Sequence, residues 1–356
     1  MKNFLFFILT IFTISVWGQV KYSNEFLSIG VGARALSMGN SVISSSSDVT
    51  SGYWNPSGLV QIKSDWDLSL MHSEYFAGIT KYDYGAGAYR YNDSLVLGFS
   101  MVRFGVDDIP NTLELIDGDG NLRYDRISSF SAADYAFIFS MAKKSTIKNL
   151  FYGANFKIIR RVAGDFASAW GFGLDVGAQY KYKNWEFGAM ARDVTTTFNA
   201  WSFNTADLKD VFEMTGNEIP ENSIEYTMPK LLLGAGYRKT FYKNWGLLAE
   251  LGLDFSFDGK RNVPIRSNFA SIDPHMGLEM DYKRIVFLRM GVNNIQQARN
   301  FFGEKETYWQ PNLGLGIHFW RLTIDYAITN IGNVSTSLYT HIFSLRLAIN
   351  KPEKSK

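Results

Sequence analysis

The stretch Gly30–Leu59, GVGARALSMGNSVISSSSDVTSGYWNPSGL, decides how the rest of the chain must be arranged. It is rich in glycine, serine and other small residues, and it ends in the aromatic turn Tyr53-Trp54-Asn55-Pro56. Glycine and the Asn-Pro pair favour tight bends, so the stretch predicts a compact, kinked segment. Everything after it reads as amphipathic strands. We therefore expect the strands to close around this segment as a barrel closes around a plug.

The chain after residue 65 alternates apolar and polar residues with a period of two, the repeat of a β-strand. In Phe172–Tyr180, for example, every second residue is apolar. Such runs are about ten residues or longer, which is the length that crosses a bilayer when a strand is tilted. The sequence therefore predicts an all-β fold, a transmembrane antiparallel up-and-down β-barrel of about fourteen strands with an N-terminal plug, or hatch. The expected strands lie near 66–75, 80–91, 94–104, 130–142, 150–162, 168–182, 184–195, 229–242, 244–257, 272–282, 284–293, 308–320, 321–330 and 338–349.

Short and long connections alternate between these strands. The longer, polar connections are expected to be loops at 105–129, 196–228, 258–271 and 294–307. Outer-membrane barrels have short periplasmic turns and long external loops. If both termini are periplasmic, the parity of the strands places every long loop outside the cell.

The N-terminus has the features of an export signal. A basic start and the apolar run Phe4–Ile14 precede small residues and Gln19, which is typical of a secretory signal peptide. We expect a signal peptide at 1–18, the hatch at 19–64, the barrel at 65–350 and a periplasmic tail at 351–356. The location that follows is the outer membrane of a Gram-negative bacterium.

Composition and motifs argue against several classes of function. The chain has no cysteine, and its formal net charge is only +2, so we expect neither thiolate metal sites nor nucleic-acid binding. The four histidines form no metal-spaced pair, and no nucleophile motif is present. We therefore expect no catalysis, no metal and no cofactor.

The plug motif also suggests a family. Gly32-Ala33-Arg34-Ala35, Met38-Gly39, Asp48 and Tyr53–Leu59, with a weaker continuation at Gly105–Pro110, resemble the opening of the PorV/PorQ outer-membrane proteins. That group is similar to the FadL-type fatty-acid transporters. The resemblance is strongest to PorV-like members of the type IX secretion system. It implies a barrel that binds secreted cargo with C-terminal sorting domains, or the translocon, and hands cargo to the cell-surface attachment machinery.

The motif does not separate secretion partners from small-molecule transporters. The alternative is therefore a FadL-like passive transporter of hydrophobic small molecules. A lateral opening and an apolar lumenal pocket would favour the transporter. A stable complex with a translocon or a secreted protein would favour the secretion role. In either case the barrel would contact outer-membrane lipid.

Two groups of residues are candidates for function. The first is the plug motif, interpreted as architecture in which Arg34 pairs with a lumenal carboxylate: Gly32, Arg34, Met38, Gly39, Trp54, Asn55, Pro56 and Gly58. The second consists of apolar residues in the two longest loops, which either pack on the barrel mouth or bind a protein partner: Ile109, Leu113, Leu115, Trp201, Phe203, Val211, Phe212 and Met214.

Charged residues also fall on the strand face opposite the apolar band. They form either lumenal ion pairs, which we favour, or a polar permeation path: Asp175, Arg192, Arg238, Glu250, Asp254, Glu279, Arg289, Asp325 and Arg346.

Overall fold

The computed structural model describes residues 23–117, 119–205, 218, 221–299, 303–329 and 339–350. The expected signal peptide and C-terminal tail lie outside these described residues. Four short helical segments come first: η1 (Glu25–Ser28), α2 (Ala33–Ser37), α3 (Ser51–Trp54) and η2 (Pro56–Gln61). In the described part of the chain, no helix is long and apolar enough to cross a membrane.

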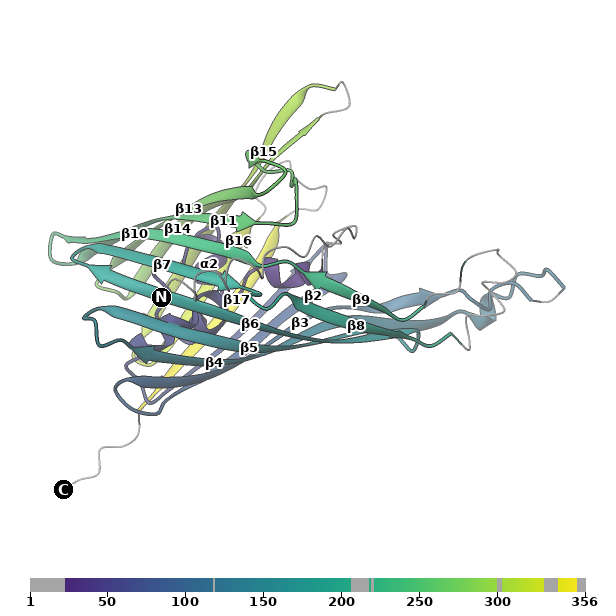
Figure 1. Cartoon of the computed structure of the whole chain (residues 1–356), viewed down its shortest axis with the longest axis horizontal. Helices are drawn as coiled ribbons and strands as arrows, with labels where there is room; N and C mark the ends of the chain where they lie inside the picture. The colour runs from purple at the N-terminus through teal and green to yellow at the C-terminus, as the bar shows by residue number, and fades with distance from the viewer. Residues whose placement is uncertain are drawn as a thin grey trace, which may run out of the picture.

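Fourteen antiparallel strands form a closed ring around these segments (Figure 1). The ring runs β1-β2-β3-β4-β5-β6-β7-β10-β11-β13-β14-β15-β16-β17 and returns to β1. This arrangement confirms the predicted fold class. The bounds are β1 (Trp66–Tyr75), β2 (Thr80–Arg90), β3 (Leu95–Asn111), β4 (Ser128–Lys144), β5 (Leu150–Ala163), β6 (Ala167–Tyr182), β7 (Trp185–Arg192), β10 (Lys230–Phe241), β11 (Trp245–Ser256), β13 (Ser271–Tyr282), β14 (Val286–Arg299), β15 (Lys305–Phe319), β16 (Leu322–Thr329) and β17 (Thr340–Ile349).

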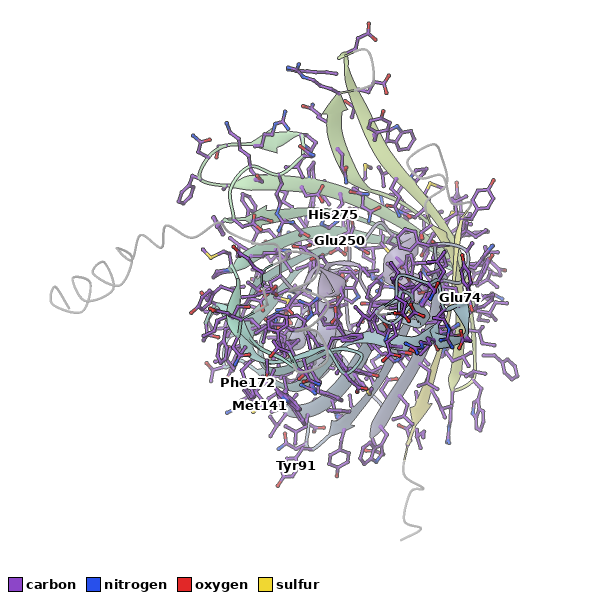
Figure 2. All side chains as sticks on the ribbon, turned by 90° about the vertical axis from the view of Figure 1, so that its right-hand side faces the viewer. Glu74, Tyr91, Met141, Phe172, Glu250 and His275 are labelled. Atoms are coloured by element: carbon purple, nitrogen blue, oxygen red, sulfur yellow. The ribbon has the colours of Figure 1, made fainter. Side chains whose placement is uncertain are left out.

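Alternate residues of each strand face opposite sides of the wall. On β11, Leu251 is 52% exposed whereas its neighbour Glu250 is 3% exposed. Figure 2 shows the same division around the ring, with Phe172 and Met141 outside and Glu250 and His275 inside. The outward apolar side chains make a belt of the kind that faces lipid in membrane-spanning barrels.

Two of the predicted long loops contain strands, so that part of the prediction is wrong. The range 196–228 holds β8 (Thr197–Phe203) and β9 (Ser223–Thr227), and 258–271 holds the short β12 (Ile265–Arg266). β3, β4, β14 and β15 also continue beyond the expected ends. The extensions are rich in polar residues and do not alternate strictly, as in Asn294–Arg299 (NIQQAR) of β14, so they lack the pattern that predicts a lipid-facing strand. They are held by ladder hydrogen bonds to their neighbours.

The wall divides at its long-loop end, between β9 and the connection that follows β11. A kink at Asp193–Thr196 separates β7 from β8, and β8 then pairs with the upper part of β6 while β9 pairs with β8. β10 instead pairs with β7 and β11, and its last partner at this end is Ser256. Beyond Ser256, no described residue pairs with β9 from the β11 side. We call this gap in the pairing, between β9 and residues 257–264, the seam (Figure 1).

The core lies inside the barrel, between the plug and the inner wall. Val31, Met38 and Ile43 of the plug are buried in one cluster with wall residues such as Met190 and Leu248. Glycines on the wall make this contact close. A Cβ at Gly291 would lie 2.1 Å from the Met38 carbonyl carbon. The wall is therefore shaped to the plug, and the two pack as one core.

Candidate functional site

The plug is bent by residues that the motif contains. Asn55 caps η2, because its Oδ1 accepts a hydrogen bond from the Ser57 amide at 3.3 Å, and Pro56 starts the helical turn. Gly39 adopts a φ of 60°, a conformation that glycine tolerates and most side chains do not. A Cβ there would lie 2.8 Å from the Val292 backbone. At these positions the backbone conformation of the plug depends on the residue that is present.

The other polar atoms of the motif also bond within the plug or to the wall. Trp54 donates its indole N–H to the Val31 carbonyl at 2.9 Å. The Asn55 amide donates to the carbonyls of Ile43 and Ala178, each at 3.1 Å. The motif thus joins the plug to itself and to β6, and it presents no free polar group to a ligand at these atoms.

Arg34 fixes the plug to the β13–β16 side of the wall. Its Nε donates to Glu279 Oε2 at 2.8 Å, and Arg289 Nε donates to the same oxygen at 2.7 Å. Arg289 also reaches Asp325 Oδ1 at 2.7 Å. Burial alone would lower the pKa of Arg34, but the Glu279 carboxylate holds that pKa above its usual value. The guanidinium is charged at any physiological pH, and the plug is held by a buried ionic chain.

A second ion pair anchors the plug to β17. Arg346 donates to Asp48 Oδ2 at 2.9 Å. Burial acts to raise the pKa of Asp48, but Arg346 and Arg34 hold that pKa below its usual range. Among the lumenal charges named from the sequence, Glu279, Arg289, Asp325 and Arg346 are thus paired, and two of these pairs reach the plug. Arg192 and Glu250 instead bond to backbone groups of the plug.

A cavity of about 670 Å³ lies against the plug at the long-loop end. Its plug side is largely apolar, with Ile29, Leu36, Ile43 and Trp54. Its wall side is polar, with amide and charged side chains that include Arg192, Lys230, Asp254, Arg261, Asn262, Asp273, His275, Asn293, Gln310 and Asn312. The cavity therefore offers an apolar surface beside a polar one. This is the arrangement that suits a molecule with an apolar body and a polar group.

The polar wall is held in place by hydrogen bonds. Arg192 donates to the carbonyls of Leu27 and Tyr53, each at 3.2 Å. One ring nitrogen of His275 lies 2.8 Å from Ser41 Oγ and the other lies 3.2 Å from Asp254 Oδ1. These contacts orient the side chains before any ligand arrives.

The stretch Ser23–Ser28, which we call the N-terminal strap, crosses the seam beside this cavity. On one side the Asn24 amide donates to Thr227 Oγ1 of β9 at 2.8 Å, and Asn199 of β8 donates to Ser23 Oγ at 2.8 Å. On the other side, Glu25 accepts a bond from Arg261 at 3.0 Å. The strap therefore links the two edges of the seam.

Glu25 is the ionic contact of the strap. Its carboxylate lies 3.0 Å from Arg261 and 3.6 Å from Lys230. Partial burial acts to raise the pKa of Glu25, but Lys230 and Arg261 lower that pKa below its usual value. The Glu25 side chain is still 41% exposed, so water can compete for this contact.

The candidate loop residues are scattered, and some do not lie in loops. Ile109 is part of β3, and Leu113 and Leu115 follow it, half-buried. Trp201 and Phe203 belong to β8, and the Arg161 guanidinium stacks 5.0 Å from the Trp201 ring. Trp201 and Phe203 therefore lie on a strand and not in a loop, and both are half-buried. The remaining three residues lie outside the described part of the chain: Val211, Phe212 and Met214.

Sequence reasoning did not identify the residues of the strap or the basic residues that face it. Glu25, Lys230 and Arg261 are separated by up to 236 positions, and no motif marks any of them. Only the ring closure brings them together. The described residues include no group of histidine and acidic side chains able to hold a metal ion.

Comparison with solved structures identifies proteins of the same fold, although sequence comparison finds no match. No protein-family model and no curated protein matches the sequence. Among solved structures, the chain is similar to the toluene transporter TodX of P. putida, with a TM-score of 0.57 and 13% identity over 91% of this chain and 99% of that one.

Two further structures give the same result. The monoaromatic hydrocarbon channel CymD matches with a TM-score of 0.56 and 12% identity, over 91% of this chain and 98% of that one. A FadL homologue of Pseudomonas aeruginosa matches with a TM-score of 0.52 and 11% identity, over 89% of this chain and 97% of that one. The chain therefore has the FadL-type fold, a plugged fourteen-stranded barrel.

Proposed function

We propose that this chain is an outer-membrane channel of FadL type that takes up small amphipathic molecules, with its short turns in the periplasm. The observation that carries the proposal is the two-faced cavity on the plug, about 670 Å³ in volume. That volume lies within the range of small-molecule sites. The proteins of similar fold are hydrocarbon and toluene transporters by name, which supports a small-molecule ligand.

The chemistry of the cavity narrows the ligand class. A purely apolar compound would leave the amides and charges of the wall side without new partners, and desolvating them is unfavourable. A molecule with one polar end can lay its body on Leu36, Ile43 and Trp54 and direct that end to the wall. We therefore propose an amphipathic ligand and not a purely hydrophobic one.

The strap offers a route by which the ligand can leave the cavity through the seam. The plug is anchored by buried ion pairs, whereas the ion pair of the strap, between Glu25 and Arg261, is partly exposed. The bonds from the strap to β8 and β9 are buried, so the Arg261 side is the edge at which we expect release to begin. We propose that release of the strap opens the cavity toward the seam while the rest of the plug stays in place.

Binding can be tested with octanoate as an amphipathic probe and toluene as an apolar one, by isothermal titration in detergent. Val263 lines the cavity, so Val263→Trp should fill it and weaken octanoate binding at least tenfold. Phe269 follows in the same connection, is 79% exposed and is not among the cavity-lining residues, so Phe269→Trp is the matched control. Equal octanoate affinity in both variants would overturn the proposal. Tighter binding of toluene than of octanoate would favour a hydrophobic ligand.

The secretion role implied by the plug motif is the second candidate. One observation supports it, the exposed apolar side chains at the tip of the β3–β4 connection, where Ile116, Leu122 and Tyr124 are 64%, 56% and 70% exposed. Exposed apolar patches mark protein-binding sites. The test is to change all three to serine and isolate complexes from native membranes. Loss of a co-purifying translocon or secreted protein, with octanoate binding unchanged, would favour the secretion role.

A further inference from the structure

The outward face of β1, β2 and β3 differs from that of β6 on another side of the barrel. On β6 the outward apolar residues continue from Tyr182 to Trp170. At a rise of ~3.3 Å per residue and a tilt of ~40°, that run spans roughly 30 Å of membrane. On β1 the outward apolar residues extend only from Trp66 to Leu70, which is roughly 10 Å by the same geometry. A lipid-facing belt is about 25 Å tall, so the outward apolar run of β1 is too short to cover the lipid-facing height alone.

Charged side chains occupy the missing part of the belt. We call this set the β1–β3 charge cluster: His72, Glu74, Lys81, Asp83, Arg103 and Asp107. His72 Nδ1 lies 2.6 Å from Asp83 Oδ1, and Arg103 lies 3.5 Å from Asp83 and 3.3 Å from Asp107. The His72 side chain is 53% exposed and that of Glu74 is 56% exposed. Figure 2 shows Glu74 on a different side of the barrel from Phe172 and Met141.

A groove of about 430 Å³ runs below the cluster on the same face. Gly85 forms its floor, and Leu70, Met101, Phe343 and Leu345 form its sides. The register explains the floor, since Gly85 lies opposite Leu70 on β1 and opposite Met101 on β3. Here the wall has a trough bounded by large apolar side chains, at the depth where other strands carry a full belt.

Lipid does not suit this face. Charged side chains in the lipid-facing belt are unfavourable, and the penalty is greatest near the midplane. An anionic lipid headgroup would need a net positive site. The cluster instead holds the acids Glu74, Asp83 and Asp107 against Lys81, Arg103 and His72. Three acids against Lys81 and Arg103 leave no net positive charge, even with His72 protonated. A set of mixed sign can be self-complementary, because the acids of one molecule can face the bases of another across a two-fold axis.

We propose that the outward face of β1–β3, with the charge cluster and the Gly85 groove, is an interface between two copies of this chain in the membrane. The second copy covers the charges and places apolar side chains in the groove. The proposal is independent of what the lumen transports.

Cysteine crosslinking tests it directly, because the chain has no native cysteine. Leu70→Cys and, separately, Leu345→Cys place a thiol on the groove, and Leu251→Cys on β11 is the matched control. The wild-type Leu70, Leu345 and Leu251 side chains are 65%, 47% and 52% exposed. After oxidation in native membranes, at least one groove variant should give a disulfide-linked dimer of this chain, at least tenfold more than the control.

Filling the groove gives a second test. A Cβ at Gly85 would lie 3.5 Å from Leu70, an ordinary contact, so we expect Gly85→Leu to fold. A folded barrel migrates differently on a gel before and after boiling, and this difference is the check on folding. Gly85→Leu should abolish the dimer in native mass spectrometry, whereas Ala249→Leu on the outward face of β11 should keep it.

Three results would overturn the proposal. The first is equal or absent crosslinking at the groove and control positions. The second is a crosslink only to a different protein. The third is a monomer that carries a bound lipid lost in Gly85→Leu.

Discussion

The ion pair that holds the body of the plug and the ion pair of the strap before it differ in burial. In the body, Arg34 meets Glu279 beside Arg289, and the Glu279 and Arg289 side chains are 4% and 2% exposed. In the strap, Glu25 meets Arg261 and is 41% exposed. A buried pair is costly to break because a lone charge remains in a low-dielectric site, whereas an exposed pair contributes little. The difference in burial makes the Glu25–Arg261 pair the less costly of these two ionic contacts of the hatch to break.

The largest effect is expected where the buried chain is broken. Glu279→Ala leaves Arg34 and Arg289 without their shared carboxylate and should destabilise the barrel by ~3–5 kcal/mol. The measurement is urea unfolding in detergent, followed by tryptophan fluorescence and gel mobility. Glu25→Ala is the control and should change stability by ~1 kcal/mol or less. Similar losses in the two variants would remove the distinction between body and strap.

A smaller effect is expected from packing alone. Gly39 and Gly120 have φ of 60° and 82°, so an alanine at either position carries roughly 1–2 kcal/mol of left-handed strain. At Gly39 the new Cβ also meets the Val292 backbone, whereas at Gly120 nothing lies within 4 Å. Gly39→Ala should therefore lose about 1–3 kcal/mol more than Gly120→Ala. Equal midpoints in urea would mean that the plug does not pack on β14 as described.

The smallest effect on stability, and the clearest effect on passage, is expected in the strap. The pKa values of Glu25 and Asp258 are lowered despite burial, because Lys230 and Arg261 surround Glu25 and Arg261 binds Asp258. A depressed pKa stabilises the folded contact above the ordinary value of about 4.5 for Glu25. That contribution is lost as pH falls through the depressed value.

Single-channel recording can follow this contact. Openings should be rare from pH 9 to pH 6 and should become frequent as pH falls through the depressed pKa of Glu25, where its carboxylate protonates. Glu25→Gln should show frequent openings throughout that range. A wild-type channel whose opening frequency stays unchanged from pH 7 down to the lowest pH at which the barrel remains folded, or a Glu25→Gln variant that stays closed, would show that this ion pair does not hold the strap.

The sequence predicted the ring because the lipid-facing alternation is local. The strand near 66–75 was placed where β1 lies, and the other thirteen expected strands also correspond to strands of the ring. The plug was recognised from its turn residues, since Gly39 and Asn55 specify backbone shape within a few positions. These are properties of neighbours in the chain, and a pattern can show them.

The strap, the seam and the cavity could not be predicted in that way. The seam exists because β8 leaves β7 at a kink and pairs with the upper part of β6. β6 and β8 are not consecutive strands, and no local pattern shows which strand β8 will join. Glu25 and Arg261 meet only after the ring has closed. The sequence also does not show which wall glycines contact the plug, although Gly291 determines how closely Met38 packs.

Locking the strap tests most directly whether it gates the cavity. The Asn24 and Thr227 side chains meet across one edge of the seam, with the Asn24 amide 2.8 Å from Thr227 Oγ1. Asn24→Cys with Thr227→Cys is therefore the pair chosen for oxidative crosslinking in this cysteine-free chain. Octanoate entry into proteoliposomes should fall at least tenfold when the pair is oxidised and should recover on reduction. Each single-cysteine variant should show no such redox dependence. Equal entry in the oxidised and reduced states, with the disulfide verified by mass spectrometry, would contradict a gate formed by the strap.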